Sequence, residues 1–476
     1  MYANATKLLR GRLIAPYQHD GVQWMLRRET PVDGSLKGGF LCDEMGLGKT
    51  IQLIATMLGN PRNKTLIVVP KTIVTQWRDE LKRFAPYFRV GLFDGPKRVF
   101  NPDAVDVVIA PYSIFIKPEE GTELHSISWD RIILDEGHEI RSLRSKRHIS
   151  LAFLRTDIRW IVSGTPVYNS MKDFVNLCLF LGLTKNFVQC KTEEVRSRYV
   201  LRRTKQDVSE FNQRLALPQC DFANVELDMM PEELELYQKV FEENQGRIKE
   251  LMNVSTNLGM HQMEFLECLL RIRQVMVWPQ LYLSGMAHKR KEQPEVWKHN
   301  SAKMMMLYSM MHEHPNEKSL IFCQFIEEMN VLEANFPGAY RIDGSLSKEE
   351  REAEIQGFKK AQGGAVFLIQ IKAGGQGLNL QEATRVYITS PAWNPATELQ
   401  AIARSHRTGQ TQRVVVRKLI YNGTDEWPSV EQSICALQEH KSKVCSEVLN
   451  DPRMLTQIPG PRKAVGLSDI LKIFRV

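Results

Sequence analysis

The chain has 476 residues, a formal net charge of +8 and 43% apolar residues, so it is long enough for two or three domains with buried cores. Its eight cysteines form no Cys-x-x-Cys pair, which argues against a zinc ribbon, and no apolar run is long enough to span a membrane. Without a secretory signal, the composition argues against a secreted or membrane protein and predicts a soluble, intracellular one with a mild leaning toward nucleic acid.

A glycine-punctuated loop follows an apolar run at residues 40–50, which read Phe-Leu-Cys-Asp-Glu-Met-Gly-Leu-Gly-Lys-Thr. Glycines let successive backbone amides turn toward phosphate oxygens, and Lys49 can reach the β- and γ-phosphates of a nucleotide. The Thr50 hydroxyl suits Mg²⁺, and a helix that starts here directs its positive end at the anion. Because the strict pattern has glycine where Asp43 lies, a plain strand-to-helix turn is the alternative for the loop taken alone.

Short, continuous apolar runs recur in both halves of the chain, each closed by polar residues, glycine or proline. Continuous apolar character predicts strands that are covered on both faces, hence parallel sheets. The helical pattern of residues 75–84 between two such runs predicts alternating strands and helices, and so a doubly wound α/β fold. The runs are residues 66–69, 107–109, 132–134, 160–162, 320–322, 365–369, 386–388 and 414–416.

Two carboxylates, Asp135 and Glu136, follow the third of these runs and precede Gly137 and His138. Ligands of open α/β sheets bind beyond the carboxyl ends of the strands. An acid at that place beside a phosphate loop can coordinate Mg²⁺, and a second acid can orient or deprotonate the attacking water. An acidic helix start is the alternative, but together with the loop the pair favours metal–ATP chemistry.

Two further motifs of the first half carry weaker signals. Residues 163–166, Ser-Gly-Thr-Pro, end the fourth run, where small hydroxyl residues can relay between a nucleotide and a second ligand; taken alone they form an ordinary turn. The basic cluster at residues 202–205 fits a solvated face or loop by itself.

A region with helical texture, residues 231–280, separates the two strand-rich halves. Leu234, Tyr237 and Phe241 share one helix face, and Pro231 suits a first helical position. We therefore predict four parts, which are a first α/β lobe at 1–218, a helical insertion and connector at 219–298, a second α/β lobe at 299–450 and a C-terminal tail at 451–476.

The second half holds a glycine-rich segment, an arginine pair and a helix signal. Residues 371–379 permit close approach of the backbone to a nucleic-acid phosphate, or form a plain turn.

Arg404 and Arg407 are three residues apart, which on a helix places both on one face. Such a pair, brought in by a second domain, can neutralise a transferring γ-phosphoryl group; a clamp on a phosphate backbone or a carboxylate is the alternative. Ser429 and Gln432 have capping-box spacing, which predicts a helix that packs on its own domain or on the other one.

In this order the motifs resemble those of the Swi/Snf-type DNA-dependent ATPases, a branch of helicase superfamily 2, over residues 13–449. In that family aspartate is usual at the first place of the phosphate loop, which accounts for Asp43. The other segments that carry the resemblance are residues 13–24, 135–138, 163–166, 199–205, 341–345 and 393–395.

The resemblance implies two RecA-like, doubly wound lobes with ATP and Mg²⁺ between them. It implies that Thr50 and Asp135 hold the metal and that Gln18 reads adenine. The implied catalytic residues are Lys49, Asp135, Glu136, Arg404 and Arg407. The implied nucleotide contacts are Gln18, Asp43, Glu44, Met45, Gly46, Leu47, Gly48, Lys49 and Thr50.

The resemblance also implies an ATP-dependent translocase on double-stranded DNA that remodels nucleosomes or other protein–DNA complexes. Contacts mostly to phosphates would make DNA binding sequence-tolerant and salt-sensitive. The expected partners are duplex DNA, nucleosomal or naked, and other protein subunits, but no membrane; the expected place is the nucleus of a cell or, for a virus-encoded protein, the viral factory or virion. The implied DNA contacts are Lys71, Thr72, Ser113, Ser345, Gly375 and Trp393.

Several positions depart from the family pattern, but none removes a catalytic carboxylate, lysine or arginine, so activity is expected. A strand-separating helicase of the same superfamily and a non-catalytic DNA-binding scaffold with the same fold are the alternatives. A fork-unwinding assay tests the first, and an ATPase assay with and without duplex DNA tests the second. The departures are Gln370 and Ile371 in place of a Ser-Thr-like pair, Tyr168 in place of glutamine, and Ser390 and Ala392 in place of aspartates.

Overall fold

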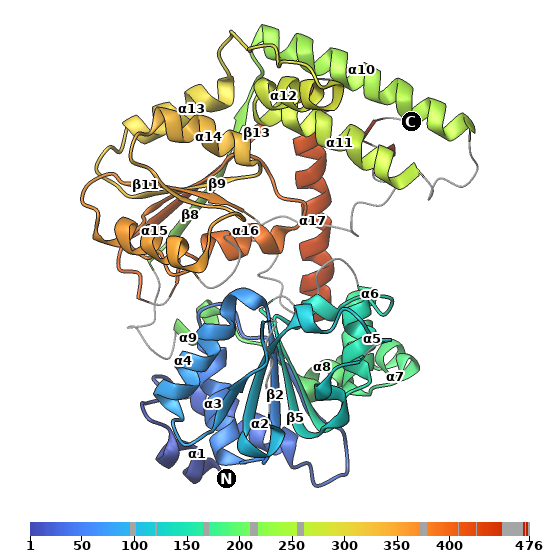
Figure 1. The fold of residues 1–476 in the computed structure, drawn as a ribbon, viewed down its shortest axis with the longest axis vertical. Helices are drawn as coiled ribbons and strands as arrows, with labels where there is room; N and C mark the ends of the chain where they lie inside the picture. The colour runs from blue at the N-terminus through green and yellow to red at the C-terminus, as the bar shows by residue number, and fades with distance from the viewer. Residues whose placement is uncertain are drawn as a thin grey trace. The chain divides into compact units, whose positions relative to one another are not determined.

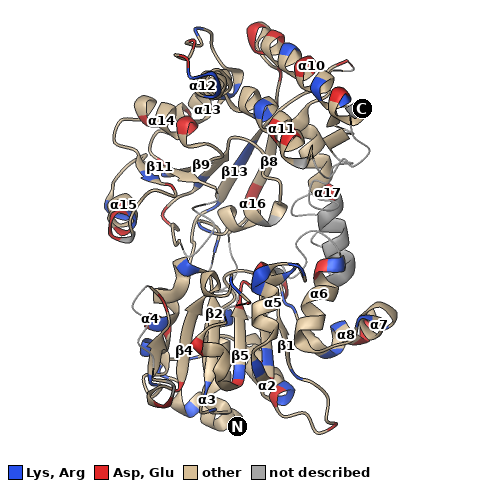
Figure 2. Cartoon of the chain, turned by 45° about the vertical axis from the view of Figure 1, so that its right-hand side comes forward, with Lys and Arg blue, Asp and Glu red and all other residues tan. Residues whose placement is uncertain are grey.

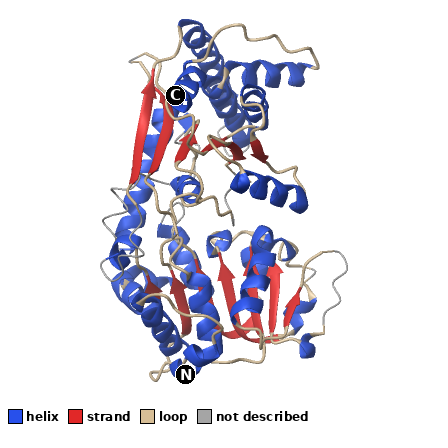
Figure 3. Ribbon diagram, turned by 90° about the vertical axis from the view of Figure 1, so that its left-hand side faces the viewer, coloured by secondary structure: helices blue, strands red, loops and turns tan. Residues whose placement is uncertain are grey.

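The computed structural model describes residues 1–95, 101–119, 121–164, 171–209, 218–254, 261–371, 373, 378–407, 409–424, 426–449, 470–471 and 473–474. The chain divides into two compact units, of which the first consists mainly of residues 1–217 and the second mainly of residues 218–443. Each unit is built on one parallel sheet with helices packed on its faces (Figures 1 and 3). The predicted α/β fold with two doubly wound, parallel-sheet lobes is thus confirmed.

The first lobe has a seven-stranded sheet in the order β3-β4-β2-β5-β6-β1-β7, and every pairing in it is parallel. The four apolar runs predicted for this half lie in its buried strands. The strands are β1 (Lys37–Leu41), β2 (Thr65–Val69), β3 (Val90–Leu92), β4 (Val107–Pro111), β5 (Ser128–Asp135), β6 (Arg155–Val162) and β7 (Val200–Leu201). The α-helices are α1 (Tyr2–Leu8), α2 (Pro16–Glu29), α3 (Lys49–Gly59), α4 (Val74–Phe84), α5 (Lys146–Ala152), α6 (Met171–Leu181), α7 (Lys185–Cys190), α8 (Thr192–Tyr199) and α9 (Lys205–Ser209). Short 3₁₀ helices are η1 (Lys71–Ile73), η2 (Pro102–Ala104), η3 (Tyr112–Ile114), η4 (Glu123–Ser126) and η5 (Gly137–Ile140).

The second lobe has a six-stranded sheet in the order β10-β11-β9-β12-β13-β8, again with parallel pairings only. Its four predicted apolar runs also lie in strands. The strands are β8 (Cys220–Leu227), β9 (Ser319–Cys323), β10 (Tyr340–Ile342), β11 (Val366–Gln370), β12 (Arg385–Ile388) and β13 (Val414–Tyr421). The helices are α10 (Pro231–Val254), α11 (Gln262–Val277), α12 (Pro279–Arg290), α13 (Ala302–His312), α14 (Ile326–Asn335), α15 (Lys348–Lys360), α16 (Pro395–Ile402) and α17 (Val430–Leu449).

The helical region between the strand-rich halves shares its hydrophobic core with the second sheet. Tyr237 and Phe241 of α10 are buried in the same cluster as Leu419 and Tyr421 of β13. Strand β8, which lies in the range predicted as insertion and connector, pairs with β13 along its whole length. The bounds of the four predicted parts stay predictions, and the helices α10, α11 and α12 pack in the core of the second lobe.

Helix α17 begins where the sequence predicts it. The Ser429 hydroxyl accepts a hydrogen bond from the backbone N–H of Gln432 at 3.1 Å, which caps the first turn. Among the described residues, no helix combines the length and apolar character that a bilayer crossing requires.

A fully buried ion pair ties two helices of the first lobe to its sheet. Arg131 of β5 donates from Nε and Nη2 to the two carboxylate oxygens of Glu29, at 2.7 and 2.5 Å. The indole N–H of Trp160 and the amide of Asn60 donate to the same carboxylate at 2.9 and 2.7 Å. Both carboxylate oxygens of Glu29 accept hydrogen bonds from these three residues. The Glu29 carboxylate therefore links the end of α2 with the end of α3, β5 and β6.

We expect Glu29→Ala to destabilise the first lobe by about 3–5 kcal/mol, because it leaves the Arg131 guanidinium buried without its carboxylate. For a unit of this size the loss lowers the melting temperature by roughly 6–20 °C, which thermal unfolding followed by circular dichroism measures. The control is Asp157→Ala, which removes an exposed pair with Lys37 (3.3 Å) and is expected to cost less than about 1 kcal/mol. Equal losses in the two variants contradict the prediction.

Candidate nucleotide site

The predicted phosphate loop connects the end of β1 to the start of α3 in the first lobe. Gly46 and Gly48 have φ angles of 92° and 76°, in the region that favours glycine. A Cβ atom on Gly48 would lie 2.6 Å from the side-chain nitrogen of Gln18, and the positive φ angle strains any larger residue, so this position favours glycine. The loop ends at Gly48, and α3 begins at the next residue. Backbone N–H groups and the helix dipole at this N-terminus favour an anion.

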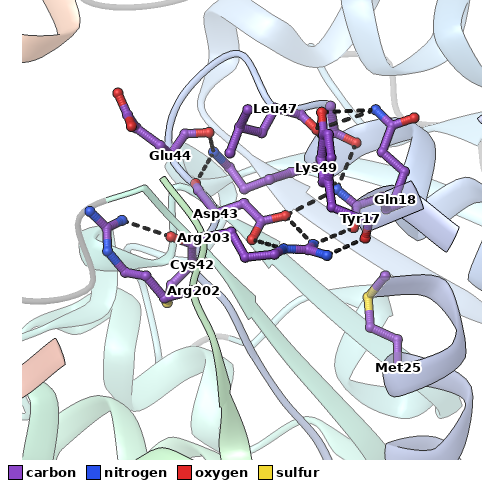
Figure 4. Close-up of polar contacts among 12 residues, drawn as sticks. Tyr17, Gln18, Met25, Cys42, Asp43, Glu44, Leu47, Lys49, Arg202 and Arg203 are labelled. Carbon is purple, nitrogen blue, oxygen red and sulfur yellow. Dashed lines mark hydrogen bonds and ion pairs between the residues drawn. The ribbon is translucent and has the colours of Figure 1, made fainter. Parts of the chain in front are cut away.

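The ammonium group of Lys49 lies over this loop. Its Nζ donates hydrogen bonds to the carbonyl oxygens of Asp43 at 2.8 Å and Glu44 at 3.4 Å (Figure 4). A phosphate group offers the same amine stronger, charged acceptors than two carbonyl oxygens. The lysine is thus held at the loop by weak partners that a nucleotide can replace.

Helix α2 contacts the same loop from the other side. The Tyr17 hydroxyl and the Gln18 amide both donate to the carbonyl oxygen of Leu47, at 3.1 and 3.3 Å (Figure 4). The amide oxygen of Gln18 accepts from the backbone N–H of Ile14 at 2.8 Å. Gln18 therefore lies beside the loop, while its predicted contact with adenine stays a prediction. An open surface depression of about 360 Å³ at the start of α2 is lined by Leu13, Ile14, Ala15, Pro16, His19 and Asp20.

The basic cluster at residues 202–205 also lines the loop, although the sequence alone favours a solvated face. The β1–β7 pairing continues into the loop. The backbone N–H of Cys42 donates to the carbonyl oxygen of Leu201 at 2.7 Å, and the backbone N–H of Glu44 donates to the carbonyl oxygen of Arg203 at 2.8 Å. Arg202 donates to the Cys42 carbonyl at 2.8 Å. The backbone N–H of Lys205 donates to the Glu44 carboxylate at 2.8 Å.

The acidic pair predicted for metal–ATP chemistry lies at the carboxyl end of β5. One oxygen of Asp135 accepts from the indole N–H of Trp77 at 2.7 Å, and the other accepts from the backbone N–H of Glu136 at 3.0 Å. Burial, and then the neighbouring charge of Glu136, raise the pKa of Asp135 to about 6, against the opposing effects of the Trp77 hydrogen bond and the Lys49 ammonium. Each of these two carboxylates makes ionisation of the other less favourable. A cation bound between them stabilises the ionised form of both.

Glu136 has the left-handed backbone conformation, with φ 51° and ψ 47°. A residue other than glycine is held there at a cost of about 1–3 kcal/mol, and such strain gathers at functional sites. His138 lies 3.4 Å from both the Glu136 carboxylate and the Ser163 hydroxyl at the end of β6. The acidic box and the first residue of the Ser-Gly-Thr-Pro motif therefore meet; Thr165, Pro166 and Tyr168 lie outside the described residues.

If Asp135 binds Mg²⁺, nucleotide binding depends on pH. With a pKa of about 6, about nine in ten Asp135 carboxyls carry a proton at pH 5 in the free protein and about one in ten at pH 7. Because a metal ligand must be ionised, we expect the affinity for Mg–ATP to fall up to about tenfold per pH unit below 6. Calorimetric titration between pH 5 and 8 measures it, and Asp135→Asn shows the titration of the nucleotide itself. Identical profiles for the two proteins contradict the prediction.

The two predicted finger arginines lie beyond a helix rather than on one. Helix α16 ends at Ile402, and the backbone N–H groups of Arg404 and Ser405 bond to carbonyls three residues earlier, at 3.1 Å each. The Ser405 hydroxyl also donates to the carbonyl of Ala383, which fixes the turn. Arg404 is buried and donates to the carbonyl of Leu378 at 3.4 Å. The expectation of one shared helix face for Arg404 and Arg407 is wrong.

The predicted DNA contacts of the first lobe follow two neighbouring strands. Lys71 and Thr72 follow β2 and Ser113 follows β4, and all three are exposed. Since β2 pairs with both β4 and β5, these residues lie at the same edge of the sheet as Asp135. Lysine and arginine are otherwise dispersed among acidic residues over both lobes (Figure 2).

The predicted DNA contacts of the second lobe have partners within that lobe. The Ser345 hydroxyl donates to Asp343 at 2.6 Å. The guanidinium of Arg273, from α11, lies 4.9 Å from the ring centre of Trp393. Gly375 and most of the glycine-rich segment lie outside the described residues.

Comparison with protein-family models places the chain. A model described as the SNF2-related domain matches residues 17–281, which is more than half of the chain. The chain belongs to the SNF2-related family. A second model, the helicase conserved C-terminal domain, matches residues 302–409. The SNF2-related domain and the helicase C-terminal domain support the predicted class, a DNA-dependent ATPase.

Individual relatives of this SNF2-related chain come from bacteria, viruses and animals. YwqA of Bacillus subtilis, named for ATP-dependent helicase or translocase activity, is 31% identical over 94% of this chain and 50% of its own length. The "probable global transactivator" of Orgyia pseudotsugata multicapsid polyhedrosis virus is 28% identical over 96% of this chain and 93% of its own. The human SWI/SNF-related matrix-associated actin-dependent regulator of chromatin subfamily A member 1 is 28% identical over 94% and 45%. The chain thus spans about half the length of the bacterial and human relatives.

A solved structure of the Sulfolobus solfataricus SWI2/SNF2 ATPase core in complex with double-stranded DNA is 24% identical. The alignment covers 98% of this chain and 97% of that one, with a TM-score of 0.41.

Proposed function

We propose that this SNF2-related chain is an ATP-driven translocase on double-stranded DNA, which acts on nucleosomes or other protein–DNA complexes. The observation that carries the proposal is the meeting of two motifs at one edge of the first sheet. The phosphate loop follows β1 and the pair Asp135–Glu136 lies at the end of β5, and these two strands flank β6 in an all-parallel sheet, so both motifs lie at its carboxyl edge. A cation beside two carboxylates, next to a loop that favours anions, fits a nucleoside triphosphate with its metal.

The residues present fit ATP with Mg²⁺. The loop between β1 and α3 favours glycine at position 48, and among the described residues the hydrogen-bond acceptors of Lys49 are two carbonyl oxygens. In the proposal the loop amides and Lys49 hold the phosphates, and Thr50 with Asp135 holds the metal. Glu136 orients or deprotonates the attacking water from its fixed backbone position. When bound, Mg²⁺ draws charge from the phosphate oxygens of the bond that breaks.

The second lobe supplies the remaining charge in this proposal. Arg404 and Arg407 reach the γ-phosphate when the two lobes close, so that hydrolysis is linked to a step along DNA. Exposed Lys71, Thr72 and Ser113, at the same sheet edge as Asp135, contact the phosphates of the duplex. Binding is then tolerant of sequence and weakens steeply with salt. We expect the protein where such duplexes are, in a nucleus or at a site of viral DNA.

Three DNA assays with the full chain test the proposal. We expect ATP turnover to rise with duplex DNA, and an ATP-dependent displacement of a third strand bound to the duplex, which reports movement along it. A fork substrate is expected to stay closed. Fork opening without third-strand displacement overturns the proposal in favour of a helicase. No turnover with naked duplex or nucleosomes overturns it in favour of a scaffold.

A further inference from the structure

A carboxylate is buried inside the loop that is proposed to hold phosphates. Asp43 is fully buried, and its position is the first of the phosphate loop, between β1 and the glycines. A negative charge at this place repels the phosphate groups that the loop is proposed to bind, in a setting where water screens poorly. The loop therefore needs a compensating cation that stays in place when the nucleotide arrives.

Arg203 supplies that cation through a two-pronged contact. Its Nε donates to one oxygen of Asp43 at 2.9 Å, and its Nη2 donates to the other (Figure 4). The amide of Gln52, from α3, donates to the same carboxylate at 3.1 Å. Such forked arginine–carboxylate pairs are the strongest and most directional of protein hydrogen bonds. All three residues lie in the first lobe.

The geometry also fixes the position of Arg203. Its guanidinium donates to the side-chain oxygen of Gln52 at 2.8 Å and to the backbone carbonyl of Tyr17, and it lies 5.1 Å from the Tyr17 ring centre. A Cβ atom on Gly21 of α2 would lie 2.7 Å from Arg203 Nη2, so the packing leaves little space for another placement. Arg202 and Lys205 instead contact Cys42 and Glu44.

We propose that Arg203 is a positioning residue that neutralises Asp43 and thereby sets the affinity of the loop for polyphosphate; this rests on the proposed function of the loop. Arg203 acts through Asp43. Its effect therefore scales with the negative charge of the ligand and is absent for a ligand without phosphate. A purely structural role, transmitted through Tyr17 and α2, would affect all nucleotides alike.

The test measures dissociation constants of ATP, ADP and adenosine without DNA, for the wild type and Arg203→Met. We expect the variant to lose roughly tenfold or more in affinity for ATP, less for ADP and less than about twofold for adenosine. The control is Arg89→Met, which breaks another arginine–aspartate fork of the same lobe, an exposed one with Asp106, and is expected to change none of the three. Equal losses for ATP and adenosine overturn the proposal.

Removal of the carboxylate provides the second arm. The double variant Asp43→Asn with Arg203→Met is expected to regain ATP affinity to within about threefold of the wild type, because the unopposed charge is gone. Arg203→Lys keeps a positive charge beside Asp43, so it is expected to bind ATP within about threefold of the wild type, and it stays informative where Arg203→Met does not fold. A tenfold weaker binding of ATP by Arg203→Lys overturns the proposal.

Failure of the proposed function is recognised separately. If the wild type binds ATP but does not move on DNA, the proposed translocase function is wrong. The dissociation constants then still decide whether Arg203 has the proposed role. A wild type that binds no ATP contradicts both.

Discussion

Lys49→Ala abolishes DNA-stimulated ATP hydrolysis: we expect turnover to fall by about 10²–10³-fold or more. The Lys49 amine lies over the phosphate loop, where it bonds to the carbonyls of Asp43 and Glu44. Its loss removes a positive charge from the site where negative charge develops during the reaction. Steady-state phosphate release with saturating duplex DNA measures the effect.

Lys64→Ala is the matched control for this variant. Lys64 precedes β2 at the opposite end of the strands and pairs with Asp103 at the surface, at 3.2 Å. We expect its turnover and its unfolding temperature to equal those of the wild type, because surface pairs contribute little to stability. Full turnover by Lys49→Ala contradicts the assignment of the phosphate loop.

The strands that the sequence predicts are those that helices cover on both faces. β2 and β9 are continuous apolar runs for this reason, so the local sequence is enough to predict both strands. β8 is an edge strand with one neighbour, and most of its side chains are only partly buried, so it has no apolar run. β3, β7 and β10 have two or three residues, too few for any period to appear.

The candidate site divides in the same way. The phosphate loop and the acidic pair are contiguous in sequence, so their residues can be named from spacing. Trp77 and Arg203 reach them from 58 and 160 residues away, and neither partner can be inferred from local pattern. A buried tryptophan needs an acceptor for its N–H, which is the one signal that Trp77 offers. A basic cluster predicts a solvated face in most proteins, and that is why Arg203 was missed.

The arginine pair shows a different limit of local pattern. A spacing of three residues indicates a shared helix face only where a helix continues. Here hydrogen bonds to residues 378–383 hold the chain after Ile402. The backbone N–H of Leu380 donates to the carbonyl oxygen of Arg404 at 3.0 Å, and the side-chain amide of Gln410 donates to the carbonyl oxygen of Gln381 at 2.9 Å. These long-range bonds stabilise a turn that no spacing rule contains.

Arg407→Ala is expected to bind ATP with nearly wild-type affinity and to hydrolyse it roughly 10³–10⁵-fold more slowly, as the loss of an arginine finger does. Arg407 is less buried than Arg404, which makes it the better position to test. Arg404 is buried and bonded to Leu378, so its removal also disturbs the turn. Single-turnover hydrolysis separates the chemical step from product release, and nucleotide titration without DNA measures binding.

A finger contributes to the transition state rather than to the bound substrate, and this decides the outcome. We expect ADP with aluminium fluoride, which resembles the transferring phosphoryl group, to bind the wild type more tightly than ATP does and Arg407→Ala no more tightly than ATP. Arg413→Ala is the control, because Arg413 is exposed and pairs with Asp221 at 2.9 Å in the second lobe. If Arg407→Ala keeps both its turnover and its preference for the analogue, the second lobe does not complete the site through this residue.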